Sequence, residues 1–376
     1  MAKFTEVLTR LTGNRQATVD TVTSAPAPLQ PIDLTDDAVV AEVLDLAVRV
    51  GEVLLASGTA AMDTAEQVQF IAATYGLAQC DVDVTYNSIV LSAYRGPTRP
   101  PASTMRIVHY RSMDFTRLAA VDRLTRRIRR EAITPDQAHD ALTAITTAPH
   151  PYNRWTATMA WAAMAASVSV LLGGGFLVAT VAFLTTMVID RVNRVLNRFG
   201  LPFFFQQVVG GLIAAAPAAT LYTFQDQLGI SIRPSLVIAA GVVVLLSGLS
   251  LVGSVQDAIM GAPITAVARF FEVVMMTGGI IAGVAISLRM TGMLGSTLPP
   301  INVEVSTITQ LPILMLSGAC ASVFYALACY AERRALTAAF LGGAAGSGVS
   351  IFVQTLDVGP VIAAAIAATV VGLAGG

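Results

Sequence analysis

The chain has 376 residues, of which 55% are hydrophobic and only 12% are charged, and its formal net charge is −1. Soluble domains carry about 25% charged residues, so this composition excludes an ordinary soluble protein, and the near-neutral balance gives no electrostatic reason to expect a nucleic-acid partner. About two-thirds of the charged side chains lie in the first 150 residues, and apolar runs follow. Because runs of roughly 20 residues match the thickness of a bilayer, the sequence predicts a soluble domain followed by α-helical membrane spans.

Residues 1–34 are rich in Thr, Ala and Pro and are predicted to form a mobile leader. The chain begins without the apolar stretch of a signal peptide, so this end is expected to stay in the cytoplasm. The three cysteines, Cys80, Cys320 and Cys329, show neither a disulfide framework nor metal-ligand spacing. We therefore expect no metal site and no cofactor.

A cytoplasmic α+β domain is predicted over residues 35–150. Thr35 is a suitable N-cap for a first helix, and 63–66 reads as a capping box that opens a second. Thr134, with Pro135 at the first helical position, begins the last helix. The predicted order is two helices, three strands and two helices, with strands from alternating residues at 82–86, 89–94 and 105–110.

Eight membrane spans are predicted in the remainder of the chain, at 155–172, 174–189, 203–224, 232–252, 266–288, 310–330, 335–354 and 358–373. Cytoplasmic loops are enriched in basic residues, and this rule sets the orientation. With the N-terminus inside, the outer loops hold only Arg233 and Arg289, whereas the inner loops hold Arg191, Arg194, Arg198, Arg269, Arg333 and Arg334. The expected arrangement is a multi-pass protein of the inner (plasma) membrane with a cytoplasmic N-terminus.

Several segments resemble the threonine/serine exporters of actinobacteria and their relatives. In the soluble part these are RVGEVLLASG at 49–58, VDVT at 82–85, SIVLS at 88–92 and LAAVDRL at 118–124. In the membrane part they are QDAI at 256–259, Gly261, Thr265, Ala268, Arg269, Glu272 and GGIIAGV at 278–284. Their order and spacing, more than any one segment, carry the resemblance.

The resemblance implies ten spans in two five-helix halves behind a soluble domain. Here 151–290 would form the first half, and 305–376 would be an incomplete second half. The expectation is therefore a chain shortened at its C-terminus, or one that works with a partner supplying the missing helices or as a homo-oligomer. An odd number of spans per half would place the two halves in opposite orientations, as in many secondary transporters.

Four polar residues near the fifth predicted span form the main candidate site for substrate binding or coupling: Asp257, Thr265, Arg269 and Glu272. Ionisable groups within a span are costly and are candidates for function by default. Arg269 would bind the carboxylate of a zwitterionic amino acid, and Asp257 or Glu272 would bind its ammonium group or carry a coupling proton. The alternative is an Arg269–Glu272 pair, three residues apart, that only anchors the end of a helix.

Three glutamines, Gln206, Gln207 and Gln310, are candidates to line a path, although interfacial anchoring is the simpler interpretation. The glycine-rich run at 342–348 lacks the Lys of a phosphate-binding loop and is better explained by close helix packing, as are Gly279 and Gly283.

The predicted function is a secondary transporter, not an enzyme, that exports threonine, serine and similar small amino acids from the cytoplasm using the proton gradient. The substrate and the coupling come from the resemblance. One alternative is export of small dicarboxylates, which would require more cations than Arg269 alone. Another is a membrane-anchored scaffold or sensor that acts through its soluble domain.

Overall fold

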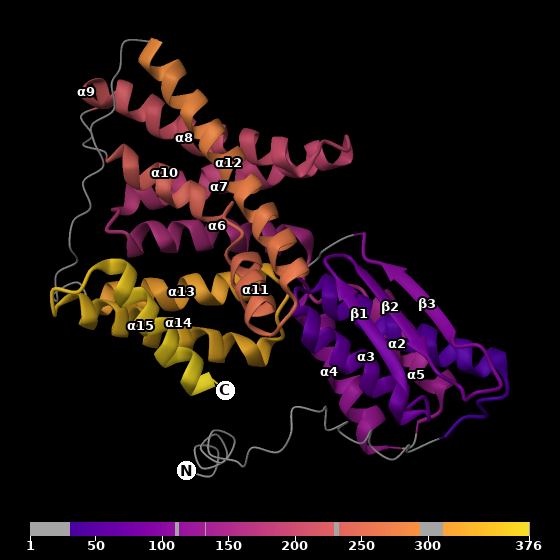
Figure 1. Ribbon diagram of the computed structural model, residues 1–376. Coiled ribbons are helices and arrows are strands. Elements are labelled where there is room, and N and C mark those ends of the chain that lie inside the picture. Colours follow the sequence, from indigo (N-terminus) through magenta and orange to yellow (C-terminus); the bar gives the residue numbers. More distant parts are fainter. Residues whose placement is uncertain (1–30, 110–112, 132, 229–232, 294–310, 376) are drawn as a thin grey trace.

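The computed structural model describes residues 31–109, 113–131, 133–228, 233–293 and 311–375, and it divides into a mixed α/β part and a helical part (Figure 1). Nearly all of the predicted leader and Gln310 lie outside these described residues. The α/β part contains α2 (Asp37–Ala56), α3 (Ala61–Thr74), β1 (Cys80–Thr85), β2 (Ser88–Ala93), β3 (Ala102–Ile107), α4 (Phe115–Arg130) and α5 (Pro135–Thr147). The predicted order of two helices, three strands and two helices is confirmed.

The three strands form one antiparallel sheet in the order β1-β2-β3. Val82 pairs with Leu91, which pairs in turn with Thr104. Helices α2 and α3 cover one face of the sheet, and α4 and α5 pack behind them (Figure 1). The buried core between these layers is aliphatic and includes Val43, Leu46, Ile71, Ile89 and Leu142.

Two of the predicted helix starts are wrong and one is confirmed. The N-cap of α2 is Asp36 rather than Thr35, because the Asp36 side chain accepts the amide hydrogen of Ala38. Helix α3 begins at Ala61, before the predicted capping box, and its own N-cap residue supplies no side-chain hydrogen bond. Helix α5 begins as predicted, with Thr134 accepting the Gln137 amide hydrogen bond and Pro135 at the first position.

The helical part comprises α6 (Arg154–Leu171), α7 (Phe176–Arg198), α8 (Phe203–Thr223), α9 (Gln225–Leu228), α10 (Pro234–Val243), α11 (Gly248–Ile259), α12 (Pro263–Met293), α13 (Leu311–Ala328), α14 (Arg333–Gln354) and α15 (Pro360–Gly375). Among the described residues, five of these are long and apolar enough to cross a membrane: α7, α8, α12, α13 and α14. A sixth span is possible if α10 and α11 cross together. The chain is therefore an integral membrane protein, and the count of eight spans stays a prediction.

The span predicted at 232–252 is not one straight helix: α10 and α11 are separated by a short break and are bent by 56° relative to each other. Every residue around this break is apolar or small, so the hydropathy pattern gave no sign of it. The break turns α11 toward the α/β part, where Figure 1 places it between the two parts of the molecule.

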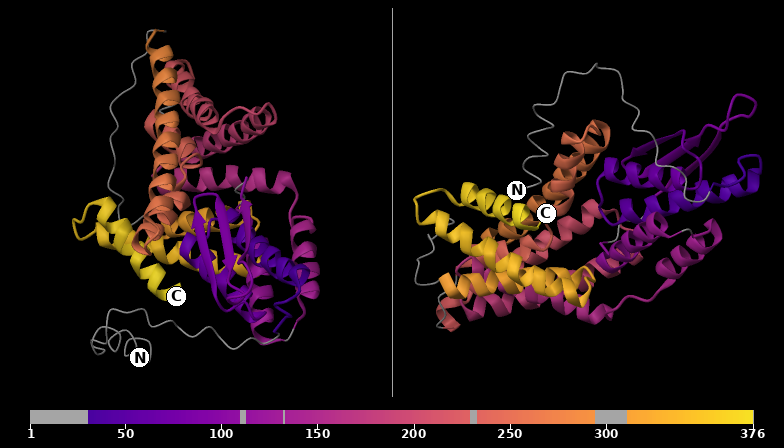
Figure 2. Two further views of the ribbon diagram at one scale, coloured as in Figure 1. Left: turned by 45° about the vertical axis from the view of Figure 1, so that its right-hand side comes forward. Right: turned by 90° about the horizontal axis from the view of Figure 1, so that it is seen from below.

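Glycines set the closest helix contacts, as predicted. A Cβ on Gly283 of α12 would overlap the Val208 carbonyl oxygen of α8, and one on Gly211 of α8 would overlap the Ile280 carbonyl of α12. Gly343 of α14 meets Gly318 of α13 in the same manner. Small residues let helix backbones approach in a membrane, where apolar burial provides little drive for association. The long helix α12, orange in Figure 2, is fixed against α8 in this way.

Candidate functional site

The candidate site lies where α11 ends and α12 begins. Gly261 adopts φ +93°, and the amide of Ala262 donates to the Asp257 carbonyl oxygen at 2.8 Å. This six-to-one bond around a left-handed glycine is the Schellman ending of a helix, and Pro263 then starts the next one. The turn brings the end of α11 close to the first turns of α12, so that residues 12 apart in sequence meet.

Asp257 and Arg269 form an ion pair across this turn. Arg269 Nη1 lies 2.9 Å from Asp257 Oδ2, and the side chains are 4% and 0% exposed. Removing two charges from water is costly, and the cost is offset only when each also gains further hydrogen bonds. The pair therefore depends on the groups that surround it.

Those surrounding groups come from the α/β part. The amide of Ala61, the first residue of α3, donates to Asp257 Oδ1 at 2.7 Å. Arg269 Nη2 donates to the Thr59 carbonyl oxygen at 3.1 Å. Asp257 thus caps the N-terminus of α3, where the helix dipole favours a negative charge. This explains why α3 begins at Ala61 without a side-chain cap of its own.

Thr265 makes a second connection between the two parts. Its hydroxyl donates to the Val84 carbonyl oxygen at 3.3 Å and accepts from the Tyr86 amide at 3.2 Å. Thr265 is 1% exposed, so both bonds are shielded from water. The structure therefore gathers Asp257, Thr265 and Arg269 against the soluble domain, while Glu272 lies half-buried three residues further along α12.

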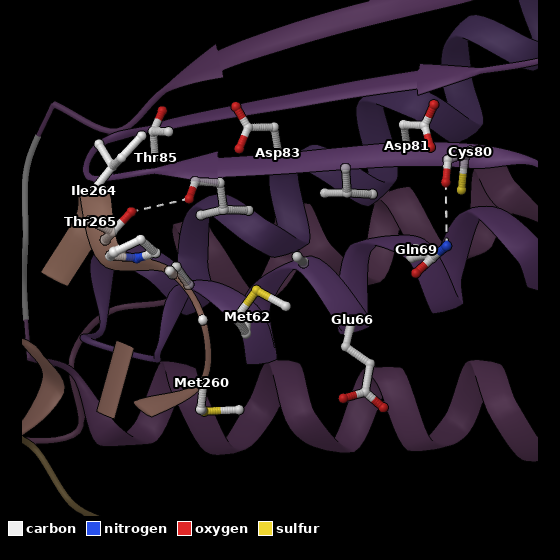
Figure 3. A pocket seen from close by; sticks show the side chains of 17 residues that line it. Met62, Glu66, Gln69, Cys80, Asp81, Asp83, Thr85, Met260, Ile264 and Thr265 are labelled. Atoms are coloured by element: carbon white, nitrogen blue, oxygen red, sulfur yellow. Dashed lines mark hydrogen bonds between the residues drawn. The ribbon is translucent and has the colours of Figure 1, made fainter. Parts of the chain in front are cut away.

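A cleft of about 710 Å³ opens beside this junction, between α3, β1 and the 260–263 turn (Figure 3). Of the described residues that line it, three are acidic and none is basic; the acidic ones are Glu66, Asp81 and Asp83. Thr265 lies at one end of the cleft, bound to the strand backbone (Figure 3). A cationic group such as an ammonium would be favoured here over an anion.

The glutamines lie apart from this junction. Gln206 and Gln207 are both on α8 and 4% exposed, and Gln206 donates to the Leu201 carbonyl oxygen at 2.8 Å. The side-chain oxygen of Gln207 is buried without a hydrogen-bond partner among the described residues. Gln206 thus contacts the turn that precedes its own helix, and a role of either glutamine in lining a path stays a prediction.

A second junction was not foreseen from the sequence. The amide of Phe115 donates to the Cys329 carbonyl oxygen at 3.0 Å, and Arg123 pairs with Glu332 at 2.7 Å. His150 pairs with Asp114 at 2.8 Å and stacks on Tyr330. The Phe115 and Arg123 contacts join α4 to the turn between α13 and α14, across more than 200 residues of sequence, and His150 adds a contact from the segment that precedes α6. Asp114, a residue type that often caps a helix, marks the start of α4 in the sequence, but nothing nearby indicates its distant partners.

A family model described as "putative threonine/serine exporter" matches residues 45–291. A threonine/serine exporter of Corynebacterium glutamicum is 42% identical over 366 residues, covering 96% of this chain and 75% of the relative. A probable threonine/serine exporter of Mycobacterium tuberculosis is 41% identical over 344 residues, covering 90% of this chain and 64% of that relative. No solved structure matches the chain.

Proposed function

Because the chain belongs to the threonine/serine exporter family and is a membrane transporter rather than an enzyme, we propose that it exports threonine, serine and similar small amino acids from the cytoplasm. Export is driven by the proton gradient, and the soluble domain and the arginine-rich loops face the cytoplasm of an inner-membrane protein. The arginine distribution supports this orientation.

The buried Asp257–Arg269 pair is the observation that carries the proposed site. A zwitterionic amino acid needs an anion for its ammonium group and a cation for its carboxylate, and the two side chains offer both within 2.9 Å of each other. Arg269 supplies a single cation to the cluster, which suits one carboxylate better than two and therefore favours an amino acid over a dicarboxylate.

In the docked arrangement the soluble domain occupies these same groups. The Ala61 N–H donates to Asp257, as the ammonium group of a substrate would. The Thr59 carbonyl accepts from Arg269, as the carboxylate of a substrate would. The substrate and the 59–61 backbone therefore compete for one ion pair. Undocking of the soluble domain opens the site, and Asp257 or Glu272 carries the coupling proton.

Efflux from vesicles containing the purified chain tests the function. Vesicles loaded with labelled threonine, serine or a four-carbon dicarboxylate should release the two amino acids and retain the diacid. Release of the diacid alone would replace the amino-acid assignment with dicarboxylate export. No release of any solute would favour either a scaffold or sensor role for the soluble domain or the need for a partner that supplies further helices.

The Ala61→Pro variant tests the competition. Pro is tolerated at the first position of a helix, and Ala60 already has the extended conformation (φ −61°, ψ 149°) that precedes Pro. The change removes the N–H that Asp257 accepts but leaves both charges in place. Efflux should then reach half of its maximal rate at a lower threonine concentration. Asp257→Asn, in contrast, should abolish efflux. If Ala61→Pro abolishes efflux as completely as Asp257→Asn, the contact supports transport instead of competing with it.

A further inference from the structure

A second cavity, separate from the candidate site, lies at the start of α6 and the end of α7. Its volume is about 370 Å³, and its lining is Asn153, Arg154, Trp155, Arg191, Arg194, Asn197 and Arg198. Helix α6 follows directly from the soluble domain, so the cavity lies on the same side of the membrane as that domain. It is also at the end of α7, one of the membrane-spanning helices.

The cavity carries an excess of positive charge. Four of its lining side chains are guanidinium groups, and Asp190 pairs with one of them, Arg194, at 3.0 Å. For the other three, no carboxylate lies within ion-pair distance in the described parts of the chain. Like charges gathered in one cavity repel one another, and a bound anion would offset this repulsion.

Arg191 carries an unsatisfied donor at this cavity. Its guanidinium lies 3.6 Å from the centroid of the Trp155 ring and donates to the Thr158 hydroxyl at 3.4 Å. Its Nε–H, however, is buried and has no acceptor among the described residues. Buried donors in folded proteins are almost always satisfied, so an acceptor from outside the chain is expected here.

The surroundings of the cavity are apolar and exposed. Trp155 is 55% exposed, and Met159 on α6, Val195 on α7 and Phe199 just past the end of α7 are exposed as well. Tryptophan is enriched at the level of lipid headgroups, and arginine clusters between membrane helices on the cytoplasmic side bind anionic headgroups. A free anion would need only the guanidinium groups, whereas a lipid would also cover the apolar side chains.

We propose that this cavity binds the phosphate of an anionic lipid headgroup, with the acyl chains lying along α6 and α7. Arg154 and Arg198 supply the outer charges, and Arg191, held by Trp155, directs its Nε–H at a phosphate oxygen. Through this site, the lipid composition of the inner leaflet would affect the start of α6, where the membrane domain follows the soluble domain. This site stands whatever the transported solute is.

Trp155 is the built-in reporter, because the chain has only two tryptophans and Trp161→Phe removes the other. The full-length protein in phosphatidylcholine nanodiscs is given a small fraction of brominated phosphatidylglycerol or, for comparison, brominated phosphatidylcholine. Quenching of Trp155 by the anionic lipid should exceed quenching by the neutral one. Equal quenching by the two lipids would overturn the proposal.

The Arg154→Gln/Arg198→Gln double variant should weaken the apparent affinity for phosphatidylglycerol about 30-fold, which corresponds to about 2 kcal/mol for two basic groups. Arg333→Gln/Arg334→Gln removes the same charge from an exposed helix start elsewhere and should leave the quenching unchanged. In a third arm, inorganic phosphate is added to nanodiscs of phosphatidylcholine alone. A response of Trp155 to phosphate that matches its response to the anionic lipid would assign the site to a soluble anion and overturn the lipid assignment.

Discussion

Asp257 binds two unlike groups at once: it forms an ion pair with the guanidinium group of Arg269 and accepts a hydrogen bond from the first amide of a helix in the soluble domain. A carboxylate buried without both would be strongly unfavourable, since breaking a buried ion pair costs about 3–5 kcal/mol. The docked soluble domain and the charged side chain at the start of α12 therefore share this one carboxylate. A transport role for the pair requires that its partners can be exchanged.

Charge-conserving substitutions distinguish a binding role from simple anchoring. Arg269 uses two nitrogens for two partners, Asp257 and the Thr59 carbonyl, and the single ammonium of Lys cannot reproduce that fork. Arg269→Lys should lower threonine efflux about tenfold or more, since one charge-assisted hydrogen bond contributes about 1.5–3 kcal/mol. Glu272→Asp, one methylene shorter, should also lose most transport. Near-normal efflux per inserted protein in both variants would make the cluster structural and turn attention to Gln207.

Glu332 makes the second junction sensitive to acid. The hydrogen bond from Arg123 holds the pKa of this carboxyl below its ordinary value of 4.5. A lowered pKa in the folded state stabilises the contact fully above pH 4.5, and the stabilisation is lost as the pH falls through the folded-state value. Above pH 4.5, the Phe115 amide, which donates to Cys329, should therefore exchange more slowly in the unmodified protein than in Glu332→Gln. This difference between the two proteins should disappear as the pH falls. Parallel behaviour of the two proteins would show that this pair does not hold the junction.

At the scale of the elements, local patterns predicted most of the soluble domain. Caps, strand alternation and Pro135 act within a few residues, and the order of its helices and strands is as expected. The start of α3 was mispredicted because its cap, Asp257, is 196 residues away. The break between α10 and α11 was missed because apolar residues satisfy a straight span and a bent one equally. The sequence predicted Asp257, Thr265 and Arg269 as candidate site residues. Their partners in the soluble domain are backbone groups, which no side-chain pattern reveals.

Two glycines on α12 provide a matched test of helix packing. Gly283 meets the backbone of α8, whereas a Cβ on Gly278 would find nothing within 4 Å. Gly283→Ala should destabilise the protein by about 1–3 kcal/mol, as overpacking of a close contact does. Gly278→Ala should be neutral or slightly stabilising, because Ala favours a helix more than Gly. Equal melting temperatures for the two variants in detergent would show that α8 and α12 do not pack through this contact.

At the scale of the whole molecule, the soluble domain touches the membrane helices at two turns, between α11 and α12 and between α13 and α14. Both turns must face the compartment that holds the soluble domain. The expected orientation follows from the arginine distribution, and the structure adds the requirement that both junctions lie on one side. The soluble domain is thus held at two points, and the candidate site lies at the first of them, the turn between α11 and α12.

Cysteine labelling checks the orientation. Arg198→Cys and Gln227→Cys place exposed thiols beyond opposite ends of α8. In intact cells, a membrane-impermeant maleimide should label position 227 and spare position 198. Native Cys80 should not interfere, because burial raises its pKa to about 11 and keeps it as the unreactive thiol. The reverse pattern would place the soluble domain outside.

The central claim is that the docked soluble domain competes with the substrate for the Asp257–Arg269 pair, and a reversible cross-link tests it most directly. Gln256 donates to Asp63 at 3.2 Å across the junction, and Gln256 is exposed. A chain with Asp63→Cys and Gln256→Cys is linked in vesicles by a short bifunctional thiosulfonate, with each single variant as control. Threonine efflux should stop on linking, return on reduction and continue in both controls. Efflux from the fully linked protein at the rate of the reduced one would contradict the account.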